Sequence, residues 1–290
     1  MKVIEAIGDM QAQSRAWRQA GLRVGLVPTM GALHDGHLSL IRLATKLANR
    51  VVVSIFVNPA QFGENEDFAA YPRDFERDRD LCAQHGVGAI FHPDAGEMYA
   101  PDFSTWVVEE SLSRPWCGEY RPGHFRGVAT VVVKLCNAVL PEVAVFGEKD
   151  AQQALVVERI IRDLNLPVEI ATGPTVREPD GLAMSSRNRY LDAEQRHQAA
   201  ALPRGLALAR EAFLRGERRG AALAGLVKRE IVAAGGRLQY AEVRSLTSLE
   251  LLETVDRPAL LAVAAHFGKT RLIDNCRLHP EPPNPGTSET

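Results

Sequence analysis

Two histidines three residues apart stand where an expected strand turns into an expected helix. His34 and His37 follow the apolar run 23–27, and the amphipathic stretch that begins at Leu38 comes directly after them. A glycine between them, Gly36, removes a side chain where a ligand must lie close to the backbone. At such a junction, unpaired backbone N–H groups and the positive end of the helix dipole favour an anion such as phosphate. We expect the active site here, because a pair of histidines at this turn favours function over the capping or surface role of a single one.

Other polar groups follow other expected strands. Lys149 could neutralise phosphate charge as a transition state develops, although its loop taken alone favours a solvated lysine at a helix start. Gln61 and Gln153 carry neutral amides that could hold a hydroxyl or a carboxylate, and each taken singly is more often a surface residue. The segment 184–187 combines two hydroxyls with a guanidinium, which suits closure over a triphosphate, or alternatively a helix cap or linker. Further candidates for contacts to an anion are Arg121, His124 and Arg126.

Several common cofactor sites are not indicated. The four cysteines are widely scattered with no Cys-x-x-Cys pair, so we expect reduced thiols rather than a zinc site or a disulfide framework. They are Cys82, Cys117, Cys136 and Cys276. The histidine pair has no third ligand at a typical local spacing, and we therefore assign no protein metal ligands. Neither a phosphate-binding P-loop nor a Gly-x-Gly-x-x-Gly turn is present, which argues against a P-loop kinase or a nicotinamide dehydrogenase.

Composition is ordinary for a soluble globular protein. The chain has 290 residues, 46% of them hydrophobic, and a formal net charge of −2, which disfavours a nucleic-acid groove or a polybasic membrane face. The N-terminus lacks the long apolar core of a signal peptide. The most apolar run, 51–57, is far shorter than the roughly 20 residues that cross a bilayer. We expect a soluble, cytoplasmic protein with no membrane or nucleic-acid partner.

Strands and helices alternate over residues 1–187, which is typical of a doubly wound parallel sheet whose ligands lie at the carboxyl ends of the strands. The expected strands are 23–27, 51–57, 87–92, 143–146 and 168–171. The expected helices are 9–20 with Asp9 as N-cap, one from the histidine turn to about 49, 72–85 with Pro72 in its first turn, 125–140 and 151–164. Segment 93–122 is expected to be irregular, with 105–109 as a candidate strand. The polar loops 29–36, 58–63 and 147–150 would then lie at strand ends.

The residue pattern of the chain changes after Arg187. Helical periodicity runs from about Asp192 to 234, and short strands are expected at 238–244, 259–265 and 270–275. We therefore expect an α/β domain over 1–187 and a smaller α+β domain over 188–278. The remaining segment, 279–290, is rich in Pro, Ser, Thr and Glu without apolar periodicity, and we expect it to be disordered.

Five ordered blocks resemble the signatures of the pantoate–β-alanine ligases. They are PTMGALHDGH at 28–37, IFVNPAQF at 55–62, RPGHFRGV at 121–128, FGEKD at 146–150 and DGLAMSSRN at 180–188. The resemblance extends over about residues 3–278, and five blocks in order are far more specific than any one of them.

The resemblance implies a Rossmann-like nucleotidyltransferase fold, a homodimer and a two-step ligation. ATP and pantoate would form an enzyme-bound pantoyl adenylate and pyrophosphate with Mg²⁺ as cofactor, and the amine of β-alanine would then release AMP and pantothenate. His37 would act as proton donor, with His34 and Lys149 assisting on phosphate. Gln61 and Gln153 would hold pantoate, with Gln61 also near β-alanine. The residues implied for ATP binding are Met30, Gly31, Ala32, Leu33, His34, Asp35, Gly36, His37, Gly147, Glu148, Lys149, Asp150, Val176, Met184, Ser185, Ser186 and Arg187.

Two departures from the family pattern stand out. Arg77-Asp78 occupies a place where an acidic pair is frequent, so we assign no metal or substrate role to that pair and leave it out of the site. Ala60, where methionine is common, would enlarge the pantoate side of the pocket. Three other functions are alternatives: an adenylyltransferase that moves AMP onto a phosphorylated substrate, a nucleotide-binding module without chemistry, and an RNA-handling protein. The last is the weakest, since no basic surface is evident.

Overall fold

The computed structural model describes residues 1–64 and 66–280. The chain divides into two compact units, the first formed by 1–178 with 183–186 and the second by 179–182 with the residues from 187 onward. The backbone therefore passes between the units three times near Arg187, where a single boundary was expected. Most of the expected disordered tail, from 281 on, lies outside the described residues.

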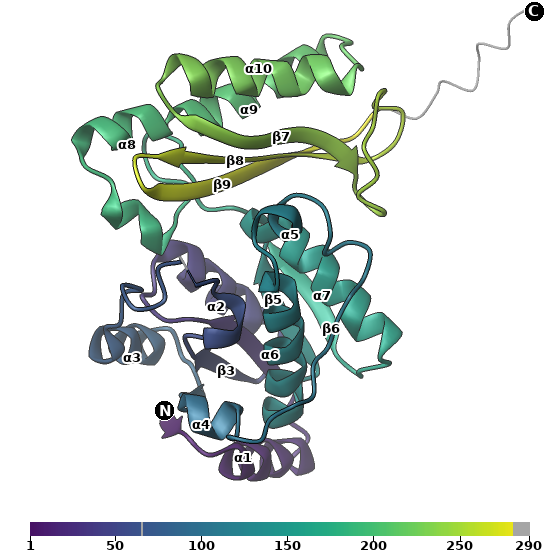
Figure 1. Ribbon diagram of the computed structural model, residues 1–290. Helices are drawn as coiled ribbons and strands as arrows, with labels where there is room; N and C mark the ends of the chain where they lie inside the picture. Colours follow the sequence, from purple (N-terminus) through teal and green to yellow (C-terminus); the bar gives the residue numbers. More distant parts are fainter. Residues whose placement is uncertain (65, 281–290) are drawn as a thin grey trace, which may run out of the picture. The chain divides into compact units, whose positions relative to one another are not determined.

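The first unit is built on a six-stranded sheet in which every pair of neighbours is parallel (Figure 1). In spatial order the strands are β1 (Lys2–Ile4), β4 (Ala89–Phe91), β3 (Arg50–Ile55), β2 (Val24–Thr29), β5 (Val143–Gly147) and β6 (Glu169–Gly173). The continuous β-branched run of β3 is buried, as a strand covered on both faces requires. The expected doubly wound sheet is confirmed, and the edge strand β1, too short to show a period, is an addition to it.

The order of these strands places a switch point between β2 and β5. The chain runs outward from β2 to β3 and β4, and then returns to the other side of β2 as β5. The two strands pair directly at Gly25–Val143 and Leu26–Ala144. Ligands of open α/β sheets bind outside the carboxyl ends of the strands at such a point. The loops that follow β2 and β5 are thus brought together by topology.

Helices cover both faces of this sheet. They are α1 (Ile7–Gln19), α2 (Asp35–Leu47), α3 (Phe75–Gln84), α4 (Ala95–Met98), α5 (Cys117–Tyr120), α6 (His124–Val139) and α7 (Ala151–Asp163), with 3₁₀ turns η1 (Pro59–Gln61) and η2 (Glu148–Asp150). Ile41 of α2 and Cys82 of α3 join Val27, Val53 and Val145 in one apolar cluster. On the other face α6 contacts α1, α7 and β2. The site loops therefore stand on a rigid support.

Three local expectations are wrong. Helix α1 begins at Ile7 with Ala6 at its cap, so Asp9 lies in the first turn instead of capping it. Helix α3 begins after Asp74, whose carboxylate accepts the N–H of Arg77, and Pro72 lies before the helix. Segment 105–109 is not a strand, and the N–H of Val107 donates to the Thr130 hydroxyl on α6 at 3.1 Å instead of to a neighbouring strand.

The second unit is an antiparallel sheet backed by helices. Strands β7 (Arg237–Ser245), β8 (Ala259–Phe267) and β9 (Thr270–Leu278) lie in sequence order. The helices are α8 (Ala193–Ala199), α9 (Ala201–Leu214) and α10 (Gly220–Ala233), and the 3₁₀ turn η3 (Ser186–Tyr190) precedes them. Leu206, Val227 and Phe267 belong to their shared core. This agrees with the α+β fold that we expected for this part of the sequence.

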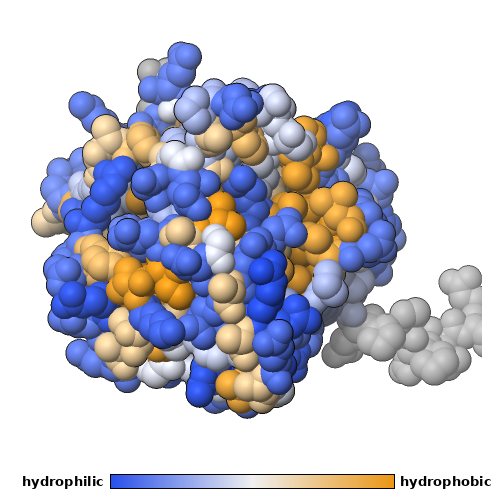
Figure 2. Space-filling model, turned by 90° about the horizontal axis from the view of Figure 1, so that it is seen from below, coloured by the Kyte–Doolittle hydropathy of each residue, from blue (hydrophilic) through white to orange (hydrophobic). Residues whose placement is uncertain are grey.

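On the face that Figure 2 shows, most of the surface is hydrophilic, and apolar patches interrupt it. Large apolar side chains that remain exposed include Trp106 and Val108, in the extended segment that follows α4. Among the described residues, no helix is both long enough and apolar enough to span a membrane.

Candidate active site

The two histidines cap the start of α2. Nδ1 of His34 accepts the N–H of Gly36 at 3.2 Å, and Nδ1 of His37 accepts the N–H of His34 at 3.3 Å. The ring centroids lie 4.0 Å apart. Because a ring nitrogen that accepts a hydrogen bond carries no proton, each neutral ring holds its proton on Nε2. The two side chains are therefore a pair of Nε2–H donors with fixed rings.

Burial keeps both rings neutral. It lowers the pKa of His34 to about 4, with the charge of Lys149 as the next cause. It also lowers the pKa of His37 well below its usual value, with His34 and Lys149 as further causes. At neutral pH these histidines can donate hydrogen bonds to phosphate, but in this structure neither is an imidazolium.

The backbone of the preceding turn is not available as we expected. The N–H of Gly31 donates to the Thr29 hydroxyl at 3.1 Å. The N–H groups of Ala32 and Leu33 donate to the two carboxylate oxygens of Asp78, at 2.7 and 2.8 Å. The prediction that this turn offers unpaired N–H groups is thus wrong for these three residues. It is also wrong for His34 and Gly36, whose N–H groups donate to the histidine rings. An anion here must be held mainly by side-chain donors.

Acidification is expected to destabilise the folded chain through His34. Its pKa is about 4 in the folded state and about 6.5 when unfolded, so between these values the unfolded chain binds more protons. The free energy of unfolding therefore falls as the pH falls, by up to roughly 3 kcal/mol. His34→Asn keeps an acceptor for the N–H of Gly36 and cannot titrate. Urea unfolding at pH 7 and 4.5 should show a smaller loss for this variant, and equal losses would contradict the assignment.

Lys149 lies in the loop that follows β5. Gly147 ends the strand, and Glu148–Asp150 form the 3₁₀ turn η2 before α7. The Lys149 ammonium lies 4.0 Å from a carboxylate oxygen of Asp150, and its charge acts on both histidine rings. The structure thus brings this lysine together with the histidine turn, as the adjacency of β2 and β5 requires.

The segment around Met184 lies beside the same turn. The N–H of Met184 donates to the carbonyl of Val176 at 2.9 Å, and a Cβ built on Gly36 would lie 3.7 Å from Cβ of Met184. The buried hydroxyl of Ser186 contacts the Tyr71 hydroxyl at 3.1 Å. Ser185 lies between them in the chain, whereas Arg187 is grouped with the second unit.

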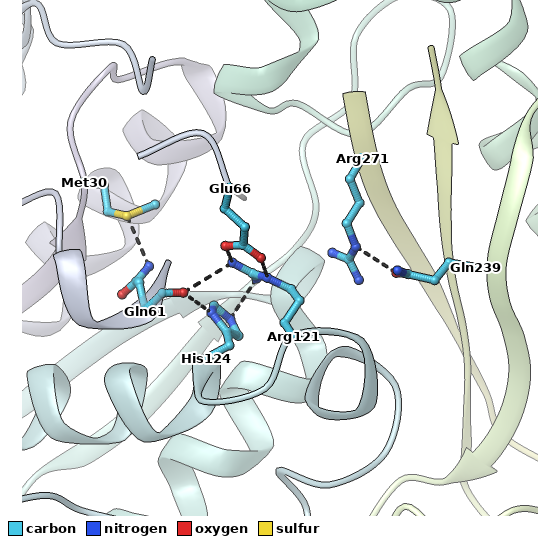
Figure 3. Close-up of polar contacts among 7 residues, drawn as sticks. All are labelled: Met30, Gln61, Glu66, Arg121, His124, Gln239 and Arg271. Carbon is cyan, nitrogen blue, oxygen red and sulfur yellow. Dashed lines mark hydrogen bonds and ion pairs between the residues drawn. The ribbon is translucent and has the colours of Figure 1, made fainter. Parts of the chain in front are cut away.

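Gln61 is held with its amide in one orientation (Figure 3). Its Nε2 donates to the sulfur of Met30 at 3.1 Å, and its Oε1 accepts from Nδ2 of Asn58 at 3.0 Å. Asn58 is buried and also accepts the hydroxyl of Tyr99 at 2.8 Å, which fixes its own amide. This arrangement turns the NH₂ group of Gln61 toward the histidine turn.

Arg121 and His124 hold the backbone of Gln61 rather than offering bare cations. Nδ1 of His124 lies 2.8 Å from the Gln61 carbonyl, and Nη1 of Arg121 lies 3.0 Å from Nε2 of His124 (Figure 3). Because a guanidinium only donates, Nε2 accepts and Nδ1–H donates to the carbonyl. Glu66 accepts two hydrogen bonds from Arg121, both 2.6 Å long. Burial alone would raise the pKa of Glu66, but Arg121 outweighs it and holds that pKa below its usual value.

A glycine on α6 sets how closely η1 can approach. A Cβ built on Gly127 would lie 2.1 Å from the carbonyl oxygen of Ala60. Gly127→Ala is therefore expected to lower the free energy of unfolding by about 1–3 kcal/mol, because backbone must move. Gly8→Ala on α1 meets nothing within 4 Å and should be neutral or slightly stabilising. Urea unfolding of both variants checks this, and equal stability of the two would contradict it.

Comparisons with known proteins show the family of this chain. The model of the pantoate-beta-alanine ligase family matches residues 2–277. The chain belongs to the pantoate–β-alanine ligase family. A pantothenate synthetase of Syntrophobacter fumaroxidans is 52% identical over 282 residues, which are 97% of this chain and 99% of that protein. One of Thermotoga neapolitana is 53% identical over 280 residues, 95% and 99% of the two chains.

Solved structures of this ligase family have the same fold. Pantothenate synthetase from Thermus thermophilus is 44% identical, with a TM-score of 0.90 over 97% of this chain and 100% of that one. The pantoate-beta-alanine ligase from Francisella tularensis is 31% identical, with a TM-score of 0.79 over 95% and 97% of the two chains. The latter structure is described as a complex with beta-gamma ATP and beta-alanine.

Sequence reasoning assigned no role to Asn58 and left Asp78 out of the site, whereas the structure shows that they contact Gln61 and the histidine turn. Asn58 precedes a proline directly after a strand, a signal for a turn but not for a hydrogen bond to Gln61. Asp78 looks like one of several acidic residues in the first turns of a charged helix. Of the two neighbouring glutamines on α7, Gln152 is buried and bonded to the loop 112–117, whereas Gln153 is half-buried.

Proposed function

We propose that this chain condenses pantoate with β-alanine at the expense of ATP, through an enzyme-bound pantoyl adenylate. The observation that carries the proposal is the convergence of two fixed Nε2–H donors and the Lys149 ammonium at the switch point of the sheet. Membership of the ligase family supports the same reaction. The product would be pantothenate, a precursor of coenzyme A.

In the first step, a carboxylate oxygen of pantoate attacks the α-phosphorus of ATP. The bond from this phosphorus to the bridging oxygen breaks, and pyrophosphate leaves with the electron pair. Negative charge grows on the phosphate oxygens, where His34, His37 and Lys149 would stabilise it. His37 has the proton-donor role, and the geometry supports donation from a neutral Nε2–H.

In the second step, the neutral amine of β-alanine attacks the acyl carbon, the bond from this carbon to the phosphate oxygen breaks, AMP leaves with the electron pair, and the amine proton passes to water. Gln61 and Gln153 would hold pantoate, and Gln61 would also lie near β-alanine. The fixed amide of Gln61 supports its part, since a preoriented donor loses little freedom on binding. The step requires no covalent enzyme intermediate.

We assign the rest of the ATP site to the loop after β2, the loop after β5 and the segment 176–187. The residues proposed to contact ATP are Met30, Gly31, Ala32, Leu33, Asp35, Gly36, Gly147, Glu148, Asp150, Val176, Met184, Ser185, Ser186 and Arg187. Residues 1–64 and 66–280 contain no group of three or more His, Cys, Asp or Glu placed to hold a metal ion. We therefore propose that Mg²⁺ enters with the triphosphate, as part of the substrate complex.

The proposal also includes the oligomeric state, the cellular location and the role of the second unit. We propose a homodimer, as is usual in the family, and the exposed Trp106 and Val108 offer apolar surface for it. We place the protein in the cytoplasm, where its substrate ATP is made. The second unit is proposed to act as a lid over bound ATP.

Exchange of labelled pyrophosphate into ATP tests the function most directly. Exchange should require pantoate and should proceed without β-alanine, because only the first step is reversed. With both acids present, mass spectrometry should find AMP and pantothenate. A dinucleotide product would indicate an adenylyltransferase instead, and ATP binding without exchange would overturn the proposal.

A further inference from the structure

The turn before the histidines is held in a strained conformation. Gly31 and Ala32 have φ values of +80° and +50°, and the second of these is unusual for a residue with a Cβ. A backbone in this region persists only where its surroundings fix it. The carboxylate of Asp78 supplies that fixation, since its two oxygens accept the N–H groups of Ala32 and Leu33 at 2.7 and 2.8 Å.

The helix that carries Asp78, α3, also contacts the carbonyl group of Leu33. Nη1 of Arg77 donates to the carbonyl of Leu33 at 2.9 Å, so two consecutive residues of α3 hold both polar groups of Leu33. Asp78 is 1% exposed, which makes each hydrogen bond to its carboxylate costly to lose. A Cβ on Gly31 would lie 2.9 Å from Oδ2 of Asp78, so the close fit also requires glycine at that position.

We propose that Asp78, assisted by Arg77, is a positioning residue for adenylation, and that it fixes the 31–34 backbone so that His34 and His37 aim their Nε2–H groups at the triphosphate. Both carboxylate oxygens accept backbone N–H groups of the turn, so Asp78 acts on the site through this turn. The inference rests on the proposed function, in which these histidines contact ATP. It also explains how the Arg77-Asp78 pair can serve where the family often has two acids.

Asp78→Asn tests this inference with a side chain of the same shape. The amide keeps one acceptor, but its NH₂ group faces an N–H that previously donated to oxygen. We expect the KM for ATP to rise about 10-fold or more, as for the loss of a hydrogen bond to a charged group, with the KM for β-alanine within about 2-fold of wild type. Pyrophosphate exchange should fall more than the reaction of preformed pantoyl adenylate with β-alanine.

Asp74→Ala is the matched control on the same helix. It removes the cap of α3, whose Oδ1 accepts the N–H of Arg77 at 3.3 Å, and leaves both contacts to the turn in place. We expect a lower Tm with an unchanged KM for ATP. A role of Asp78 in helix stability alone would give both variants that same behaviour and would overturn the inference.

A second variant covers the case in which Asp78→Asn does not fold. Arg77→Met keeps much of the side-chain stem and removes the hydrogen bond to Leu33 together with the positive charge that acts on Asp78. We expect a smaller rise in the KM for ATP, about 3-fold or more, again without a change for β-alanine. An unchanged KM for ATP would overturn the inference, whereas absence of pantoate-dependent exchange in the wild-type protein would instead overturn the proposed function.

Discussion

Replacement of His37 by alanine is expected to slow formation of pantoyl adenylate at least about 100-fold. The ring is half-buried at the start of α2, and its Nε2–H is a preoriented donor toward charge that develops on phosphate. Quenched-flow measurement of pyrophosphate and pantoyl adenylate in the first turnover, without β-alanine, gives the rate directly. Near-normal turnover would show that the role is misassigned.

Two further substitutions separate the two nitrogens of this ring. Asparagine places its amide near Nδ1 and can still accept the N–H of His34, whereas glutamine places its NH₂ group near Nε2. If donation from Nε2 matters for catalysis, His37→Gln should retain more adenylation activity than His37→Asn. If the main role of His37 is to cap the turn, His37→Asn should retain more adenylation activity than His37→Gln. In that case His37→Asn should also have the higher Tm.

Replacement of Lys149 by alanine is expected to reduce adenylation about 100-fold or more, because a charge near the developing pyrophosphate is lost. The second step should fall far less, since the leaving AMP carries less charge than the triphosphate. Preformed pantoyl adenylate with β-alanine measures the second step alone. Equal loss in both steps would indicate a general structural role.

The same variant has an electrostatic consequence that activity does not report. The charge of Lys149 lowers the pKa of both His34 and His37, so its removal should raise both values. Titration of the histidine ring protons by NMR measures this shift. Lys46→Ala, at the exposed end of α2, is the control and should change neither the pKa values nor the rate.

Much of the fold could be predicted because its signals are local. The β-branched run of β3 and the alternation of strands and helices are periodic features of short segments, and they predict a parallel sheet. The edge strand β1 has only three residues, too few for any period. The expected start of α3 at Pro72 was wrong because Asp74 caps the helix. Pro72 is also a residue typical of a first helical turn, so the sequence offered two possible starts two residues apart.

The candidate site could be predicted in part for the same reason. His34, His37 and Lys149 follow strands, and parallel strands bring their carboxyl ends to one edge, so their meeting required no tertiary detail. The pairing of Arg121 with Glu66 was not predictable, because it joins segments 55 residues apart that fold against each other. The expected cation for an anionic ligand is thereby neutralised.

The sequence by itself determined the chemical groups, the sheet that gathers them and the resemblance to a ligase family. Only the tertiary structure decided how those groups are set for use. It assigned the N–H groups of Ala32 and Leu33 to Asp78, some 45 residues away, and it left the half-buried rings of His34 and His37 as neutral donors. Hydrogen-bond partners and desolvation depend on which distant segments pack together, and a local pattern of residues does not carry that information.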